Sequence, residues 1–222
     1  MSQQAKSFER EISKRLHLDY LLHLPPGYGD DPTKKWPLIL FLHGAGERGD
    51  DLALLKVTGL PEMLDRKADL PFIVVSPQCP IYQSWFDHMD ALDALLTQIM
   101  VDYAVDTNRV YLTGLSMGGY GSWVMAVLWP ERFAAVVPIC GGGFWGYGFP
   151  ERVCVLKDVP VWVFHGAKDD TVPLEESQVL VDMLESCGDN VKFTVYPEAN
   201  HDSWTATYNN PDLYTWFLSH TR

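Results

Sequence analysis

Short apolar runs that read as buried strands alternate along this chain with longer segments that read as amphipathic helices. The runs are rich in β-branched and aromatic residues, and the helical segments repeat apolar residues every three or four positions. The expected strands are 18–28, 36–46, 71–80, 109–114, 133–142, 159–166 and 191–198. The expected helices are 51–68, 88–103, 119–130, 173–188 and 211–220, the first interrupted at Gly59-Leu60-Pro61. Such alternation is typical of an α/β fold, in which helices cover both faces of a mostly parallel sheet.

No long linker, repeat or low-complexity segment divides the 222 residues, so we expect a single domain over 1–222. The early strand is expected to add an antiparallel edge to the sheet. Ligands of such sheets bind beyond the carboxyl ends of the strands. The loops that leave those ends are 43–49, 114–119, 165–173 and 198–204. We therefore expect the residues that bind a ligand or carry out catalysis to lie in these four loops.

The net charge of the chain disfavours two classes of binding partner. The chain has 29 acidic and 17 basic residues, a formal net charge of −12. This balance disfavours nucleic acid, whose phosphates require clustered lysine and arginine, and it disfavours anionic membrane surfaces. No apolar run approaches the roughly 18 residues of a membrane-spanning helix.

The cysteines and the first residues indicate a compartment. The four cysteines are widely spaced, without a C-x-x-C pair or a metal-ligand spacing: Cys79, Cys140, Cys154 and Cys187. The polar start of the sequence contains no secretory signal pattern. The sequence therefore predicts a cytoplasmic protein with reduced thiols, and paired disulfides are the alternative.

One serine stands inside a glycine-rich motif at a strand–helix junction. Residues 114–118 read GLSMG, which fits G-x-S-x-G. In a nucleophile elbow the serine occupies a sharp turn at the top of the sheet, and the glycines prevent Cβ clashes there. An ordinary glycine-rich turn is the competing interpretation. The strand before the motif and the helix after it favour Ser116 as a nucleophile.

A serine hydroxyl needs a base, and seven histidines are available. His43 and His165 each precede a glycine at a strand end, so both are expected near the site. His201 follows the last strand. Because serine, acid and histidine follow one another in this order in one class of hydrolases, His201 is the predicted base.

The acid is predicted in the loop 165–173, HGAKDDTVP, where Asp169 and Asp170 are adjacent. One of them should accept the Nδ1 proton of the histidine, and the other caps the following helix. The residues alone do not separate the two, and Asp202 is a third choice. Backbone N–H groups of Met117 and of Ala45 are the predicted oxyanion donors. A glycine-rich strand exit without a chemical role is the alternative for the Ala45 loop.

Together these segments resemble the α/β-hydrolase superfamily. More narrowly, they are similar to its small single-domain esterases and predicted peptidases, which are related to feruloyl esterases, dienelactone-hydrolase-like proteins and the prolyl oligopeptidase catalytic domain. The similarity runs from about residue 37 to 218 and includes PLILFLHGAGERGDD, VDTNRVYLTGLSMGGYGSW, FHGAKDDTVP and HDSWTATYNNPDLYTWFLS. The family pattern H-G-x-x-D-x-x-V-P implies Asp169 as the acid, and H-G-x-G implies Ala45 as an oxyanion donor.

Two departures qualify the resemblance. Asn200 stands before the histidine, where many relatives have glycine, and a serine replaces the cysteine nucleophile of dienelactone hydrolases. The segment 141–158 is short for a cap domain, so the resemblance implies an α/β-hydrolase fold without a large cap.

The implied activity is hydrolysis of small to medium acyl or aryl esters by two-step acyl transfer, without metal or cofactor. Aromatic loop residues, Trp85 and Trp204 among them, are predicted to bind the substrate, and core packing is the alternative. A serine peptidase is the nearest rival function. A non-catalytic binding protein on the same scaffold is the more distant one.

Overall fold

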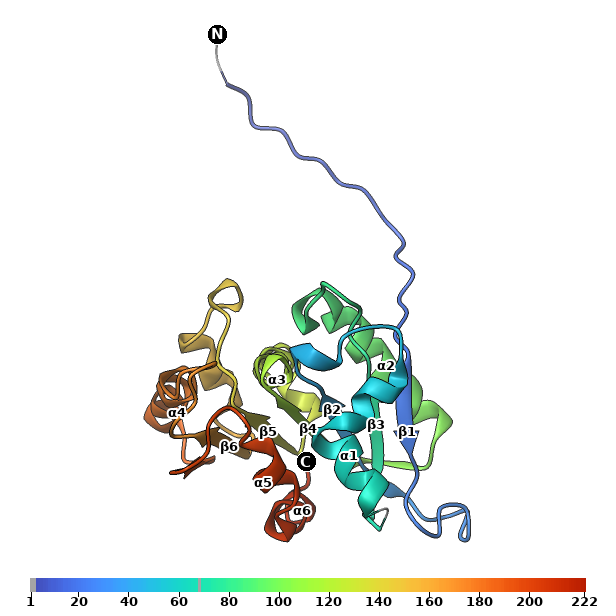
Figure 1. Ribbon diagram of the computed structural model, residues 1–222. Helices are drawn as coiled ribbons and strands as arrows, with labels where there is room; N and C mark the ends of the chain where they lie inside the picture. Colours follow the sequence, from blue (N-terminus) through green and yellow to red (C-terminus); the bar gives the residue numbers. More distant parts are fainter. Residues whose placement is uncertain (1–2, 68) are drawn as a thin grey trace.

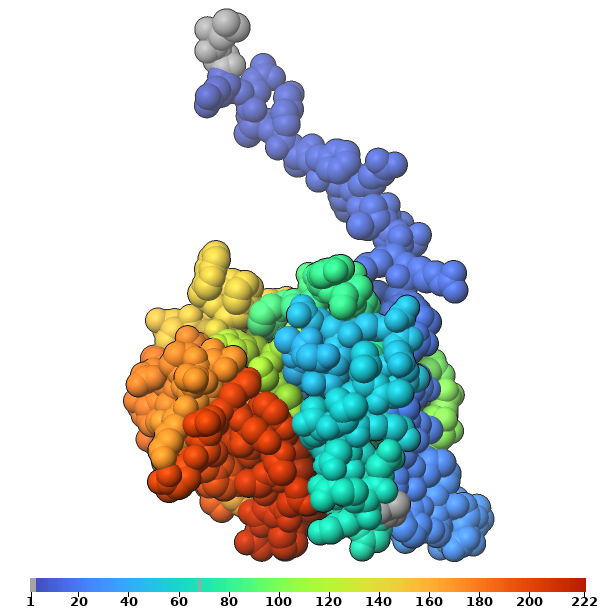
Figure 2. All heavy atoms as spheres, in the orientation of Figure 1, coloured from blue at the N-terminus to red at the C-terminus, as the bar shows by residue number. Residues whose placement is uncertain are grey.

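The computed structural model describes residues 3–67 and 69–222. Residues 3–19 have no regular secondary structure, and the first part of this segment projects away from the folded body (Figures 1 and 2), whereas Leu18 packs against the core and the carbonyl of Asp19 accepts from the N–H of Gln78. The described part of the chain forms a seven-stranded sheet in the order β1-β3-β2-β4-β5-β6-β7. The strands are β1 Tyr20–His23, β2 Trp36–Leu42, β3 Ile73–Pro77, β4 Val105–Leu115, β5 Ala135–Ile139, β6 Val161–Gly166 and β7 Val191–Tyr196. Strand β1 pairs antiparallel with β3 at the edge, and the other pairings are parallel, as predicted.

The helices cover the sheet on both faces (Figure 1). They are α1 Gly59–Arg66, α2 Met89–Asp102, α3 Met117–Leu128, α4 Glu175–Cys187, α5 Trp204–Tyr208 and α6 Pro211–Leu218. Alternate residues of β2 point to opposite faces, as the two-residue period of a strand requires. Leu38, Leu40 and Leu42 pack with α2, α3 and α4, whereas Ile39 and Phe41 pack with α1, α5 and α6. The sequence reads as a near-continuous apolar run there because both faces are buried.

Two elements differ from the prediction. The expected helix 51–68 consists of a 3₁₀ helix, Leu52–Val57, and of α1, which starts at Gly59. Gly59 has φ +70° and Pro61 lies in the first turn of α1, where a backbone N–H has no helical partner to lose. Helix α5 was not predicted, because five residues are too few to establish a periodicity.

The cysteines correct another expectation. Cys154 and Cys187 form a disulfide with a Cα–Cα distance of 5.8 Å, which ties the end of α4 to the 3₁₀ helix Glu151–Leu156. The prediction of reduced thiols is therefore wrong for this pair. Cys79 and Cys140 are free and buried. Among the described residues, no helix has the length and apolar character needed to cross a bilayer.

Candidate active site

Ser116 lies at the junction of β4 and α3, at the carboxyl end of the sheet. Its backbone has φ 53° and ψ −117°, and its N–H donates to the carbonyl of Ile139 on the neighbouring strand at 2.9 Å. A positive φ on a residue with a Cβ costs on the order of 1–3 kcal/mol and persists only where surrounding contacts enforce it. The turn thus has the strained backbone that a nucleophile elbow requires.

The glycines of the motif are required by close backbone contacts. A Cβ on Gly118 would lie 1.9 Å from the carbonyl oxygen of Leu42, and one on Gly114 would lie 2.3 Å from the carbonyl oxygen of Gly118. Neither neighbour can yield, because both are backbone atoms inside the fold. The glycines therefore let α3 begin directly against β2 and β4, which leaves the space above Ser116 open.

His201 joins the serine to an aspartate. Its Nε2 lies 2.9 Å from Ser116 Oγ, and its Nδ1 lies 2.7 Å from Asp169 Oδ2. A carboxylate only accepts hydrogen bonds, so Nδ1 carries the proton and the lone pair of Nε2 faces the serine. The side chain of Asp169 is fully buried, whereas that of His201 is 20% exposed. Three of the four loops that the sequence singled out thus meet in one hydrogen-bonded line.

The structure separates the two adjacent aspartates. Asp169 Oδ1 accepts from the N–H groups of Thr171 and Val172, at 3.0 and 2.9 Å. Burial alone would raise the pKa of Asp169, but the hydrogen bonds from His201, Val172 and Thr171 outweigh it and hold the pKa below its ordinary value. Asp170 is exposed, and its carboxylate contacts the Thr171 hydroxyl. Asp169 is thus the aspartate that faces His201 as a carboxylate.

The two predicted oxyanion donors both lie at helix starts. Met117 is the first residue of α3, and Ala45 is the first residue of the 3₁₀ helix Ala45–Glu47. N–H groups at a helix start have no partner inside the helix, so they are able to bind a ligand. A Cβ built on Gly44 would lie 3.7 Å from the Cβ of Ser116, so this loop adjoins the elbow.

His43 links the loop that carries Ala45 to two other segments of the chain. Its Nε2 accepts from the N–H of Cys79 at 2.9 Å, and its carbonyl accepts from the indole N–H of Trp85 at 2.9 Å. The ring is 1% exposed, and burial lowers its pKa to about 4. His43 is therefore a neutral ring inside the fold, and its Nδ1 is directed at the carbonyl of Gly44.

The aromatic substrate contacts need correction. Trp85 is fully buried and has no surface to offer a ligand, so its predicted role in substrate binding is wrong. A strand or loop tryptophan cannot be assigned to core or surface from the sequence when its neighbours are also aromatic. Trp204 is half-buried, donates its indole N–H to Thr58 Oγ1 at 2.8 Å, and lies edge-on to His201 with a centroid distance of 5.3 Å. Trp204 thus remains beside the site.

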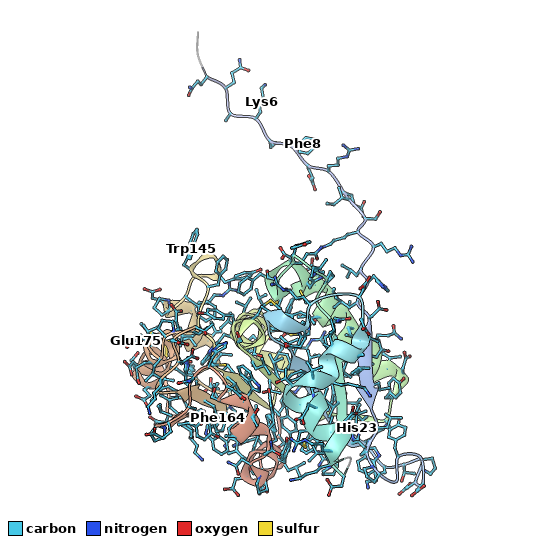
Figure 3. All side chains as sticks on the ribbon, viewed as in Figure 1. Lys6, Phe8, His23, Trp145, Phe164 and Glu175 are labelled. Carbon is cyan, nitrogen blue, oxygen red and sulfur yellow. A yellow bond between two sulfur atoms is a disulfide. The ribbon has the colours of Figure 1, made fainter. Side chains whose placement is uncertain are left out.

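A different set of residues forms an apolar cavity next to the nucleophile. We call it the aromatic pocket; it has a volume of about 320 Å³ and is lined by Phe86, Met117, Tyr120 and Phe144. The rings of Phe86 and Phe144 are stacked, with centroids 4.7 Å apart and planes 15° from parallel. Trp145, at the tip of the same loop, is 82% exposed and points away from the body (Figure 3). Of these four lining residues, the sequence predicted a role only for Met117, as an oxyanion donor.

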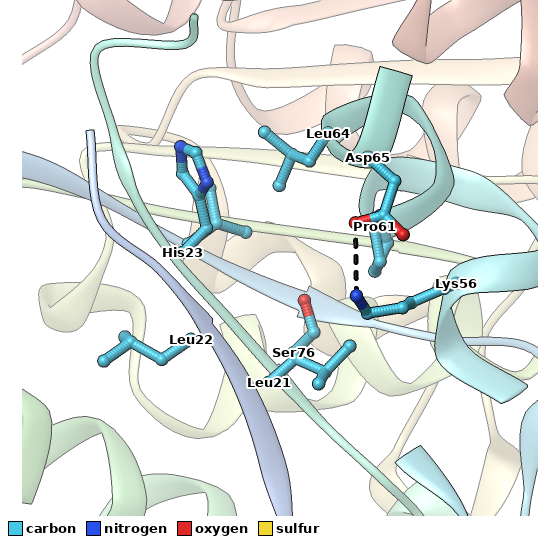
Figure 4. Close-up of a pocket in the computed structure, with 9 residues that line it drawn as sticks. Leu21, Leu22, His23, Lys56, Pro61, Leu64, Asp65 and Ser76 are labelled. Carbon is cyan, nitrogen blue, oxygen red and sulfur yellow. Dashed lines mark hydrogen bonds and ion pairs between the residues drawn. The ribbon is translucent and has the colours of Figure 1, made fainter. Parts of the chain in front are cut away.

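A second cavity lies at the β1 edge of the sheet (Figure 4). It has a volume of about 280 Å³, and Lys56 and Asp65 form an ion pair at 3.3 Å along its wall. None of the described residues that line it is Ser116, Asp169 or His201. It is therefore separate from the site at the strand ends.

One trio of side chains near the site has the donor atoms of a metal centre. Donor atoms of Cys140, Asp169 and His201 lie within 4.8 Å of one another. Burial raises the pKa of the Cys140 thiol to about 12, so the thiolate that a metal prefers is not formed. Asp169 and His201 are also committed to each other. The chemistry of this donor set suits a proton relay better than a metal.

Comparison with known proteins places the chain in a family. A model of the phospholipase/carboxylesterase family matches residues 81–210, more than half of the chain. A bifunctional acetylxylan esterase/xylanase of Neocallimastix patriciarum is 28% identical to this chain, in an alignment that covers 81% of this chain and 26% of the esterase/xylanase. A probable feruloyl esterase C of Aspergillus terreus is 26% identical, over 71% of this chain and 57% of its own.

The structural similarity agrees with the sequence similarity. The solved structure of a thermostable esterase is 36% identical, has a TM-score of 0.77, and is matched over 92% of this chain and 60% of its own. The chain thus spans 26% to 60% of the length of these three proteins. The family model covers the elbow, the acid loop and the histidine loop described above. The chain belongs to the phospholipase/carboxylesterase family and has the α/β-hydrolase fold, as its motifs predicted.

Proposed function

We propose that this chain is a serine hydrolase that cleaves carboxylic esters of small to medium size, with Ser116, His201 and Asp169 as its catalytic residues in a single domain. The observation that carries the proposal is the hydrogen-bonded line from Ser116 Oγ through His201 to Asp169, at 2.9 and 2.7 Å. Such a line makes a serine hydroxyl nucleophilic near neutral pH, because the imidazole takes its proton and the carboxylate stabilises the imidazolium. The family membership supports the same reaction class.

The reaction proceeds in two transfers of the acyl group. In the first, Ser116 Oγ attacks the ester carbonyl while its proton moves to His201 Nε2, and the carbonyl oxygen becomes an oxyanion. His201 then gives the proton to the leaving alcohol, and an acyl-serine remains. In the second, His201 takes a proton from water, the hydroxide attacks the acyl carbon, and the proton returns to Ser116 as the acid leaves. His201 is neutral again after each transfer, and Ser116 regains its proton at the end of the second.

The N–H groups of Met117 and Ala45 are the proposed oxyanion donors. They lie at helix starts and are fixed in the structure before the charge develops, which is the condition for strong electrostatic stabilisation. Arg48 helps to fix this loop, since its Nε donates to the carbonyl of Ala45 at 2.9 Å. Removal of one such donor costs on the order of 10²–10³ in kcat in comparable sites.

The substrate is a small-molecule ester whose acyl group enters the aromatic pocket. The pocket begins at Met117, directly after the nucleophile, and Tyr120 follows one helical turn later, since its N–H donates to the carbonyl of Ser116. Its apolar, stacked walls favour an acyl or aryl group over a charged one. Trp204, whose ring lies edge-on to His201, is the proposed contact for the alcohol group.

A substrate comparison tests this function. The wild-type protein should hydrolyse p-nitrophenyl acetate, and Ser116→Ala should reduce turnover by about 10⁵-fold or more, because the nucleophile is lost. Efficient cleavage of an aminoacyl-anilide without esterase activity would reverse the assignment in favour of a serine peptidase. A folded protein that cleaves neither substrate would support the binding-protein alternative.

The compartment is a separate proposal. The sequence predicts a cytoplasmic protein, but the Cys154–Cys187 disulfide weighs against that location, because disulfides persist mainly in oxidising compartments. Alkylation of the denatured protein at the moment of isolation, counted by intact mass, distinguishes the two. Four alkylated cysteines favour the cytoplasm, and two favour an oxidising compartment.

A further inference from the structure

The loop that carries Asp169 is held by a second histidine, which the reaction described above does not use. His165 is fully buried, and its Nε2 lies 2.9 Å from the carbonyl oxygen of Val172. A carbonyl only accepts, so Nε2 carries a proton and donates it. The same Nε2 lies 3.2 Å from Asp169 Oδ2, the oxygen that His201 contacts. His165 is therefore adjacent to both ends of the turn 169–172.

Val172 connects this histidine to the acid. Its N–H donates to Asp169 Oδ1 at 2.9 Å, and its carbonyl accepts from His165. These two groups belong to successive peptide planes that meet at the Val172 Cα, so a shift of this residue changes both bonds, and the carboxylate loses one of the N–H groups that orient it. The orientation of Asp169 toward His201 thus depends on where His165 holds Val172.

His165 is itself anchored on the opposite side. Its Nδ1 lies 2.8 Å from Ser177 Oγ on α4, and the Ser177 hydroxyl lies 2.7 Å from the carbonyl of Gly141. Both ring nitrogens are therefore engaged by groups of the fold, and the ring sits at the end of β6, a fully buried strand. A ring fixed at both nitrogens is suited to hold a loop.

We infer that His165 is a positioning residue, which fixes the backbone of Val172 and thereby keeps the Asp169 carboxylate in line with His201 and Ser116. The inference rests on the proposed function, since it concerns the acid of that reaction. A packing role is the alternative, in which His165 only fills space between β6 and α4. The two differ in which ring nitrogen matters, because only Nε2 reaches the Asp169 turn.

Two substitutions separate the roles. The amide nitrogen of glutamine reaches the position of a histidine Nε2, and that of asparagine the position of Nδ1. His165→Gln should keep the donor to Val172 and retain most of kcat on p-nitrophenyl acetate. His165→Asn should lower kcat by about 10²-fold at unchanged KM, since a displacement of about 1 Å in a catalytic group costs that much. Ser177→Ala is the matched control, because it releases Nδ1 and leaves Nε2 bonded, and it should retain kcat.

The outcomes separate this inference from the proposed function. If the wild type cleaves the ester, and folded His165→Gln and His165→Asn have equal kcat, whether high or low, the positioning role is overturned. If the wild type itself is inactive, the proposed function fails instead. Should either variant not fold, nitrogen NMR of histidine-labelled wild type replaces them. A proton on Nε2 of His165 supports the inference, and a ring protonated on Nδ1 alone contradicts it.

Discussion

The proposed catalytic centre (Ser116, Asp169 and His201, called the catalytic centre below) and the aromatic pocket lie side by side but are built from different contacts. The catalytic centre is fixed by backbone groups: the Ile139 carbonyl holds Ser116, and two peptide N–H groups hold Asp169. The aromatic pocket is shaped by side chains that pack against one another, such as the stacked rings of Phe86 and Phe144.

This difference decides how each region tolerates change. A backbone contact at van der Waals distance leaves no room for an added atom, so changes in the catalytic centre should have large effects. Apolar side chains exchange for others of similar volume at modest cost. We therefore expect substitutions in the catalytic centre to change activity strongly. Substitutions in the aromatic pocket should change substrate preference by a smaller amount.

The largest contrast is expected between the two adjacent aspartates. Asp169→Asn should lower kcat about 10⁴-fold, because an amide at this position favours the wrong tautomer of the histidine. Asp170→Asn, the matched control, should retain activity, since Asp170 is exposed and does not contact His201. Steady-state kinetics on p-nitrophenyl acetate measures both. A severe loss in Asp170→Asn alone would transfer the role of the acid to that residue.

Next in size is the effect of a methyl group in the elbow. Gly118→Ala places a Cβ 1.9 Å from a backbone oxygen, so we expect the free energy of unfolding to fall by about 4 kcal/mol or more. Gly46→Ala is the control, because a Cβ there meets no atom within 4 Å, and it should change stability by less than about 0.5 kcal/mol. Chemical denaturation compares the two variants. Equal stability would show that the elbow relaxes more freely than its contacts indicate.

The buried His43 should make the stability of the protein depend on pH. Its pKa in the folded protein, about 4, lies below the ordinary value of 6.5, so between these values the unfolded chain holds a proton that the folded chain lacks. Stability should therefore fall as pH drops from 6.5 toward 4, by up to about 1.4 kcal/mol per pH unit. The free energy of unfolding, measured by chemical denaturation at several pH values in this range, should depend less on pH for His43→Gln, because glutamine does not titrate. A variant with the wild-type slope would assign the dependence to other groups.

The smallest effect is expected in the aromatic pocket. Phe144→Ala removes one wall and a stacked pair worth about 0.5–1.5 kcal/mol, so kcat/KM for p-nitrophenyl benzoate should fall about tenfold. The value for the acetate should change little, because an acetyl group does not fill the pocket. Trp145→Ala is the aromatic control on the exposed loop tip and should leave both substrates unchanged. Equal losses on both esters would mean that Phe144 supports the nucleophile rather than the substrate.

The two regions also differ in how well the sequence predicts them. The glycines around Ser116 and the acid loop HGAKDDTVP are short-range patterns, because the constraints they satisfy lie within a few residues. Those patterns led to Ser116 and to the pair of aspartates. The order of serine, acid and histidine along the chain led to His201, and the resemblance to a family selected Asp169. The structure brings these residues into contact.

The features that the sequence did not predict depend on contacts between segments that are far apart in the chain. Trp85 belongs to the core because its indole reaches His43, 42 positions away, and no local pattern encodes that bond. The same holds for the Cys154–Cys187 disulfide, whose partners are 33 residues apart. The order of strands and helices followed from periodicity, since each element buries its own apolar face, whereas the short helix α5 carried too little signal.

The central claim is that Ser116 is activated as a nucleophile by His201 and Asp169. The most direct test is labelling with a fluorophosphonate, followed by intact-mass measurement and peptide mapping. We predict one adduct per chain, located on Ser116, and no adduct in folded His201→Ala over the same time. Folded wild-type protein that takes up no label, or takes it up on another residue, would contradict the account.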